Sequence, residues 1–125
     1  MNFFNDAGKE FPTKIDVKLK DAAKKGERKL KERRIEGVYI LQSNHVNGKP
    51  YWFQTEGLHA LWYWYTKEKS YWMIGNKARL GSKFGRIHSK DSVGPLEATT
   101  WSYHDGVEWI ETTDDLIILT GSLYR

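Results

Sequence analysis

Serine and histidine side chains are the residues of this chain that could carry nucleophilic or metal chemistry. A serine lies close to a histidine at three points: Ser43 and His45, His88 and Ser89, and Ser102 and His104. None of these serines lies in a G-x-S-x-G turn, and such neighbours in sequence are common by chance. The four histidines share no helical or strand spacing, so a metal site would need ligands from distant segments. These residues predict neither a nucleophile nor a metal centre.

Carboxylates near the C-terminus and a basic loop are candidates for two other kinds of chemistry. Glycoside hydrolysis needs two carboxyl groups, but Asp114-Asp115 is typical of a turn, and Glu108 and Glu111 flank Trp109. The segment 76–85, NKARLGSKFG, lacks the spacing of a nucleotide-binding loop. Its cations could still hold an anion, and the candidates are Lys77, Arg79, Lys83 and the adjoining Arg86. We therefore expect that the protein is not an enzyme and binds no cofactor and no metal.

Aromatic residues are unusually frequent, at 14% of the chain, with 6 Trp, 7 Tyr and 5 Phe. In the segment 59–65, HALWYWY, strand alternation places Trp62 and Trp64 on one face and His59 and Leu61 on the other. Both faces are apolar, so either both are covered or one is an exposed binding surface. If one is exposed, the binding residues are Trp52, Trp62, Trp64 and Trp72. We expect Trp101 and Trp109 in the core, His59 as a hydrogen-bonded, partly buried side chain and His104 in a solvated turn.

The elements that must hold these rings follow from the pattern after Glu36. Asn47-Gly48 predicts a hairpin between two runs of β-branched and aromatic residues. The predicted strands are 36–43, 50–54, 59–65, 70–75, 85–89, 99–103, 107–111 and 116–120, with loops at 76–85 and 89–98. Seven or eight short strands predict a mainly β fold, an antiparallel meander closing into a small barrel or sandwich.

The basic charge of the chain lies in one segment. Residues 14–34 contain ten basic and four acidic residues, a net charge of +6, which leaves −2 of the total of +4 for the rest. Their Lys, Glu, Ala and Leu content predicts one or two solvated helices. We expect a basic helical arm at 1–35 and a Trp-rich antiparallel β domain at 36–125. The arm cations that could contact phosphates are Lys24, Lys25, Arg28, Arg33 and Arg34.

The order of several short motifs resembles a known module. VNGKPYWF, LWYW and YWMIG are followed by GRIHS, which contains Gly85, Ile87 and Ser89, and then by Pro95 and Trp101. Over about Gly37 to Leu119, the chain resembles a Trp-rich all-β module that recurs in large multidomain eukaryotic proteins beside interaction or signalling domains. The resemblance implies an accessory or interaction role and carries no functional residues with it.

These observations favour a non-catalytic module that binds a protein through an aromatic sheet surface. The first alternative is binding of RNA or single-stranded DNA, with phosphate contacts from residues 14–34 and stacking on the aromatic strands. The second is carbohydrate binding. No apolar run approaches the ~18 residues of a membrane span, and the N-terminus does not have the pattern of a signal peptide. We therefore expect an intracellular protein, cytoplasmic or nuclear.

Overall fold

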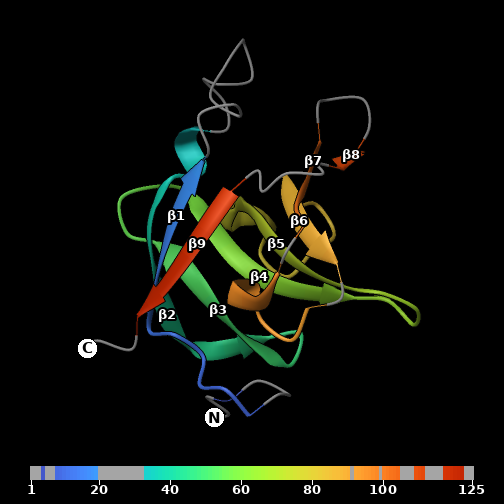
Figure 1. Cartoon of the computed structure of the whole chain (residues 1–125), viewed down its shortest axis with the longest axis horizontal. Helices are drawn as coiled ribbons and strands as arrows, with labels where there is room; N and C mark the ends of the chain where they lie inside the picture. Colours follow the sequence, from blue (N-terminus) through green and yellow to red (C-terminus); the bar gives the residue numbers. More distant parts are fainter. Residues whose placement is uncertain are drawn as a thin grey trace.

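A single antiparallel sheet of nine strands organises the computed structural model of the chain (Figure 1). The structure describes residues 4, 8–19, 33–90, 92–98, 100–104, 109–111 and 117–122. The strands are β1 (Lys14–Leu19), β2 (Gly37–Val46), β3 (Lys49–Gln54), β4 (His59–Tyr65), β5 (Ser70–Asn76), β6 (Ile87–Lys90), β7 (Ser102–His104), β8 (Trp109–Glu111) and β9 (Ile117–Ser122). Three short 3-10 helices are η2 (Arg33–Ile35), η3 (Lys77–Arg79) and η4 (Pro95–Glu97).

The sheet follows the chain from β2 to β8 as a meander, and this part was predictable. The spatial order is β8-β7-β6-β5-β4-β3-β2-β1-β9, and every neighbouring pair is antiparallel. Asn47 and Gly48 form the β2–β3 turn with φ of 53° and 80°, the left-handed backbone that a tight hairpin turn needs. The mainly β fold is therefore confirmed. The sheet curls into a half-barrel (Figure 1).

The first strand corrects the helix predicted over residues 14–34. Residues 14–19 form β1, which lies between β2 and β9 and pairs with both. Ile15, Val17 and Leu19 alternate with polar residues and are at most 3% exposed, so this stretch is a buried strand and not a solvated helix. No α-helix occurs within the described ranges, and residues 20–32 of the predicted arm lie outside them.

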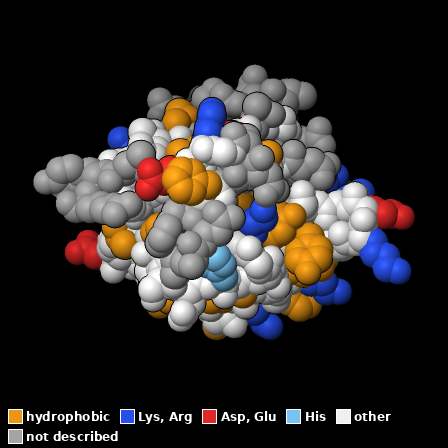
Figure 2. Space-filling view, turned by 90° about the horizontal axis from the view of Figure 1, so that it is seen from below, with side chains coloured by type: hydrophobic (Ala, Val, Ile, Leu, Met, Phe, Trp, Pro, Cys, Tyr) orange, Lys and Arg blue, Asp and Glu red, His pale blue; other side chains and the backbone are white. Residues whose placement is uncertain are grey.

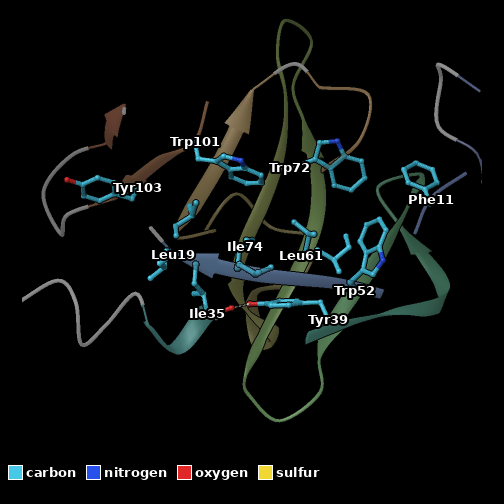
Figure 3. Close-up of a cluster of buried hydrophobic side chains, with 13 residues drawn as sticks. Phe11, Leu19, Ile35, Tyr39, Trp52, Leu61, Trp72, Ile74, Trp101 and Tyr103 are labelled. Atoms are coloured by element: carbon cyan, nitrogen blue, oxygen red, sulfur yellow. Dashed lines mark hydrogen bonds between the residues drawn. The ribbon is translucent and has the colours of Figure 1, made fainter. Parts of the chain in front are cut away.

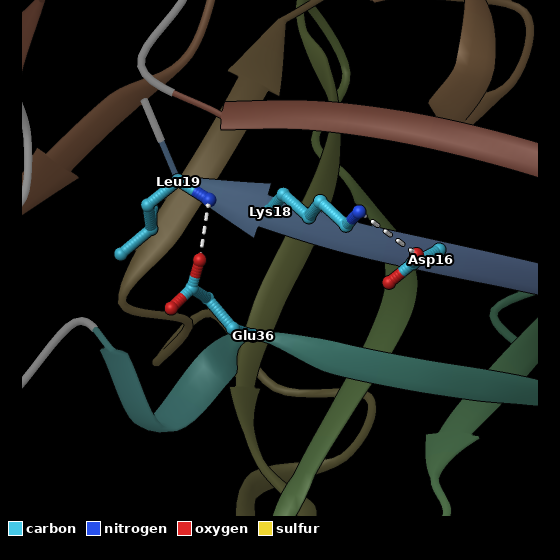
Figure 4. Close-up of polar contacts among 4 residues, drawn as sticks. All are labelled: Asp16, Lys18, Leu19 and Glu36. Atoms are coloured by element: carbon cyan, nitrogen blue, oxygen red, sulfur yellow. Dashed lines mark hydrogen bonds and ion pairs between the residues drawn. The ribbon is translucent and has the colours of Figure 1, made fainter. Parts of the chain in front are cut away.

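Polar contacts fix the end of β1 where its pairing with β2 stops. The β1–β2 register ends at Val17 and Gly37, so the backbone of Leu19 lies beyond the ladder. Its N–H donates to Glu36 Oε2 at 3.0 Å (Figure 4). A buried N–H without such an acceptor would be destabilising. The Lys18–Asp16 ion pair on the same strand is solvent-exposed, with a 3.8 Å N–O distance, and adds little stability.

The core lies on the concave side of the sheet, which we call the inner face. Its largest buried side chains include Trp52, Trp72 and Tyr39, each 0% exposed. Phe11 packs against both tryptophan rings, with centroids 5.9 Å from Trp52 and 6.1 Å from Trp72. Figure 3 shows these rings together at one end of the cluster. Trp101 is 2% exposed, which confirms its predicted place in the core.

Candidate functional site

Three of the four tryptophans predicted to bind a partner are buried. Trp52 and Trp72 belong to the inner face, where their Nε1 atoms donate to Pro12 O at 2.8 Å and Ser92 O at 3.0 Å. Trp62 points to the opposite side of the sheet, which we call the outer face, and is also 0% exposed. Only Trp64 is partly exposed. The binding surface predicted from the sequence therefore cannot include Trp52, Trp62 or Trp72, because these side chains are buried within the protein itself.

The loop 76–86 covers the centre of the outer face. Trp62 Nε1 donates to Ser82 O at 3.0 Å, and Gly85 lies directly on Met73. A Cβ at Gly85 would come within 2.8 Å of Met73 Cβ, so the loop can lie this close only with glycine at that position. The segment predicted as a loop is therefore packed against the sheet and buries Trp62.

Asn47 holds this loop to the sheet, a role that its sequence position does not predict. Its Nδ2 donates to Tyr63 O at 2.7 Å and to Gly81 O at 3.1 Å. One turn side chain therefore joins the β2–β3 hairpin, β4 and the loop. The sequence identified Asn47 only as a turn residue, because its tertiary partners lie 16 and 34 positions away.

Beside the loop, four rings form a continuous row across the outer face, the ring row, made of Trp64, Tyr71, His88 and Trp109. The centroids are 5.7 Å apart for Trp64–Tyr71, 4.8 Å for Tyr71–His88 and 3.9 Å for His88–Trp109. The last pair is stacked, with 17° between the ring planes. Trp109 is 40% exposed, so its predicted place in the core is wrong. Trp64 and Tyr71 are half-buried.

The register of the strands creates the ring row. Tyr71 lies opposite Trp64 on β4 and opposite Lys90 on β6, and His88 is two residues before Lys90 on the same face. Trp109 pairs with His104 on β7, which brings its ring next to His88. Sequence alternation places Trp64 on this face, but it cannot show which residues of β6 and β8 adjoin it.

His88 is an uncharged member of the ring row at neutral pH. It is 7% exposed, and its Nδ1 is buried without a hydrogen-bond partner in the described part of the chain. Burial, and to a smaller extent the charge of Lys90, lower the pKa of His88 to about 4. The imidazole is therefore neutral near pH 7 and presents a ring without charge.

The cations predicted to hold an anion occupy separate places. Lys77 Nζ donates to Gln54 O at 2.9 Å and lies 4.9 Å from the centroid of the Phe53 ring. Arg79 and Lys83 both lie 5.5 Å from the centroid of the Phe84 ring, which is 57% exposed.

Arg86, the fourth predicted cation, is exposed, and its backbone bonds to Ile74 O and to the N–H of His104. The contacts therefore bring Arg79 and Lys83 together around Phe84 and place Lys77 elsewhere. Of the arm cations, Arg34 is exposed, only the backbone of Arg33 is described, and Lys24, Lys25 and Arg28 lie outside the described residues.

His59 and His104 both contact other side chains of the sheet region. His59 is half-buried, and its ring Nδ1 lies within hydrogen-bond distance of Gln54 Oε1, at 3.3 Å, which confirms the expected hydrogen-bonded side chain. The same Gln54 Oε1 accepts from the backbone N–H of His59 at 3.1 Å. Burial, and then the charges of Arg86, Arg34 and Lys77, lower the pKa of His59. His104 lies in β7, half-buried, with its ring 5.3 Å from that of Trp109, so its assignment to a solvated turn is wrong.

Metal-ligand clusters and membrane-spanning helices are absent from the described ranges. No group of three or more His, Asp or Glu side chains there is arranged to hold a metal ion. No described helix has the length and apolar character needed to cross a membrane. The carboxylates considered for glycoside chemistry, Glu108, Asp114 and Asp115, lie outside the described residues, as does the side chain of Glu111.

Comparison of the chain with protein-family models, with curated proteins and with solved structures found no match. The resemblance to a Trp-rich module therefore stays a prediction.

Proposed function

We propose that the protein is a non-catalytic interaction module that binds a protein partner through the ring row. The observation that carries the proposal is the continuous contact of Trp64, Tyr71, His88 and Trp109 on one face, ending in a tryptophan that is 40% exposed. This surface replaces the set predicted from sequence and keeps one member of it, Trp64.

The rigidity of the ring row favours binding. Tryptophan and tyrosine dominate the energetics of protein interfaces, because they remove a large area from water and lose little conformational freedom. Three members of the row come from the paired strands β4, β5 and β6, and Trp109 stacks on His88 from β8. The rings are therefore ordered before a partner arrives, which lowers the entropic cost of association.

The experiment is an affinity capture from cell lysate after nuclease treatment, with direct titration of any protein that is retained. We expect Trp109→Ala to weaken binding by about 2 kcal/mol or more, the usual cost of removing a hot-spot ring. Its effect on the free energy of unfolding should stay below about 1 kcal/mol, because the ring is partly exposed.

Tyr65→Ala is the matched control for this experiment. Tyr65 is 56% exposed and stacks on Tyr63, outside the ring row, so its removal should leave binding unchanged. Equal losses of binding affinity in the two variants would contradict the proposal, because binding would then not depend on the ring row in particular. Binding that disappears with nuclease would instead assign the surface to nucleic acid.

A further inference from the structure

All charged residues in the sequence between Glu68 and Asp91 are basic. It contains six Lys and Arg residues and no acidic residue, although the chain as a whole has 20 basic and 16 acidic residues. In the structure this stretch is β5, η3, the loop over the outer face and β6. The cations are Lys69, Lys77, Arg79, Lys83, Arg86 and Lys90, and all except the half-buried Lys77 are exposed.

Two of these cations surround an exposed ring, and a third borders the ring row. Arg79 and Lys83 each lie 5.5 Å from the centroid of the Phe84 ring. Lys90 lies directly opposite Tyr71 in the β5–β6 register. Arg79, Lys83 and Lys90 form no ion pair with another described residue. On the face of the molecule seen in Figure 2, hydrophobic side chains adjoin both basic and acidic side chains.

A surface of aromatic rings bordered by exposed cations is complementary to a ligand that carries both apolar groups and negative charge. An acidic peptide and a single-stranded nucleic acid both have this composition. The geometry of the ring row separates the two. Bases bind by stacking on free ring faces, whereas one face of His88 is covered by Trp109 and the ring of Tyr71 packs at 4.8 Å on His88.

Peptide side chains do not need a free ring face, because they gain affinity from any apolar area that leaves water. The part of the chain outside residues 14–34 also has a net charge of −2, which is unfavourable for a long phosphate backbone. A local cationic border on a nearly neutral surface suits a ligand with a few carboxylates.

We propose that the outer face binds an acidic peptide segment of a protein partner, with its apolar side chains on Trp64, Tyr71 and Trp109 and its carboxylates near Arg79, Lys83 and Lys90. This inference rests on the proposed function and specifies the chemistry of the partner.

The test is a binding titration of the full chain with a labelled random copolymer of glutamate and tyrosine, which offers carboxylates and rings in many registers. Arg79→Glu/Lys83→Glu/Lys90→Glu should weaken binding by about tenfold or more, and added salt should weaken binding of the unsubstituted chain. The matched control is Lys9→Glu/Lys18→Glu/Arg34→Glu, at exposed cations outside the outer-face set, which changes the net charge equally, and we expect it to stay within about twofold of the unsubstituted chain. A thymidine oligonucleotide should compete poorly.

Each opposite result overturns the inference. No binding of the copolymer, equal weakening in the two charge-reversed variants, or tighter binding of the oligonucleotide would each exclude an acidic peptide as the ligand of this face. Trp109→Ala separates this failure from that of the proposed function. If Trp109→Ala weakens partner binding and the outer-face charge reversal does not, the ring row binds a partner that is not acidic. If only the outer-face charge reversal weakens binding and Trp109→Ala does not, the rings are not part of the interface.

Discussion

The inner and outer faces of the sheet are both rich in tryptophan, yet they differ in what covers them. The curled sheet and its flanking segments enclose the inner face, where Trp52 and Trp72 are 0% exposed. A glycine-containing loop covers the outer face over Trp62 and leaves the ring row at its edge partly exposed. The same residue type therefore stabilises the fold on one side and is available for binding on the other, because exposure depends on the covering segment.

The largest loss of stability is expected from a substitution on the inner face. Trp72→Ala should lower the free energy of unfolding by about 3–5 kcal/mol, because it removes a fully buried ring and leaves a cavity. It also leaves Ser92 O without the Nε1 donor at 3.0 Å. Urea denaturation monitored by circular dichroism measures the loss. A decrease below about 1 kcal/mol would show that the inner face tolerates cavities and is not the main core.

A smaller loss of stability, limited to the region of the loop, is expected when Trp62 beneath the loop is substituted. Trp62→Phe keeps an apolar ring but leaves Ser82 O without its donor, so stability should fall by about 1–3 kcal/mol. Hydrogen exchange should accelerate at the backbone amides of residues 77–85 and remain unchanged in β1. Uniform acceleration along the sheet would contradict this, because the loop would then not be a separate covering unit. Trp52→Phe on the inner face is the matched comparison.

The smallest effect concerns pH and the ring row. His88 has a pKa of about 4 in the folded chain and an ordinary value of 6.5, so the unfolded chain binds more protons between these values. Stability is therefore greatest above about pH 6.5, falls as the pH decreases toward 4 and levels off below it. We expect a loss of about 1–2 kcal/mol, less than the full shift implies, because a small local opening would let water reach the protonated ring.

A variant isolates the contribution of His88. Because the pKa of His59 is lowered as well, the unsubstituted chain loses stability in acid through both residues. His88→Gln should reduce the slope of unfolding free energy against pH between 4 and 6.5. An unchanged slope in His88→Gln would show that its ring is hydrated in solution and not packed between Tyr71 and Trp109.

The meander was predictable because its signals are local. Asn47-Gly48 supplies the left-handed turn, and the alternation in HALWYWY places residues correctly on two faces. β1 was missed although Ile15, Val17 and Leu19 alternate with Lys14, Asp16 and Lys18. The Lys, Glu and Ala content of the following residues outweighed this short period-2 pattern. The partners of β1 lie far away in sequence, so no local signal indicates that it pairs with β2 and β9.

The binding residues were harder to predict than the strands. Two apolar faces were evident, but their coverage depends on tertiary contacts of the loop with Asn47, Trp62 and Met73. Trp109 has the sequence surroundings of a core residue, and its exposure follows from the position of β8 at one end of the strand order. The exposure of a ring therefore cannot be derived from its neighbours in the chain alone.

The pairing of β1 with β9 has a consequence for how the protein is made. Thr13 bonds to Ser122, 109 positions later, and β1 stays without this neighbour until the residues of β9 have been synthesised. At translation rates of ~5–20 residues per second, that interval is roughly 5–20 s. During it, the newly made chain lacks the strand that borders Ile15, Val17 and Leu19 and is open to mispairing and aggregation.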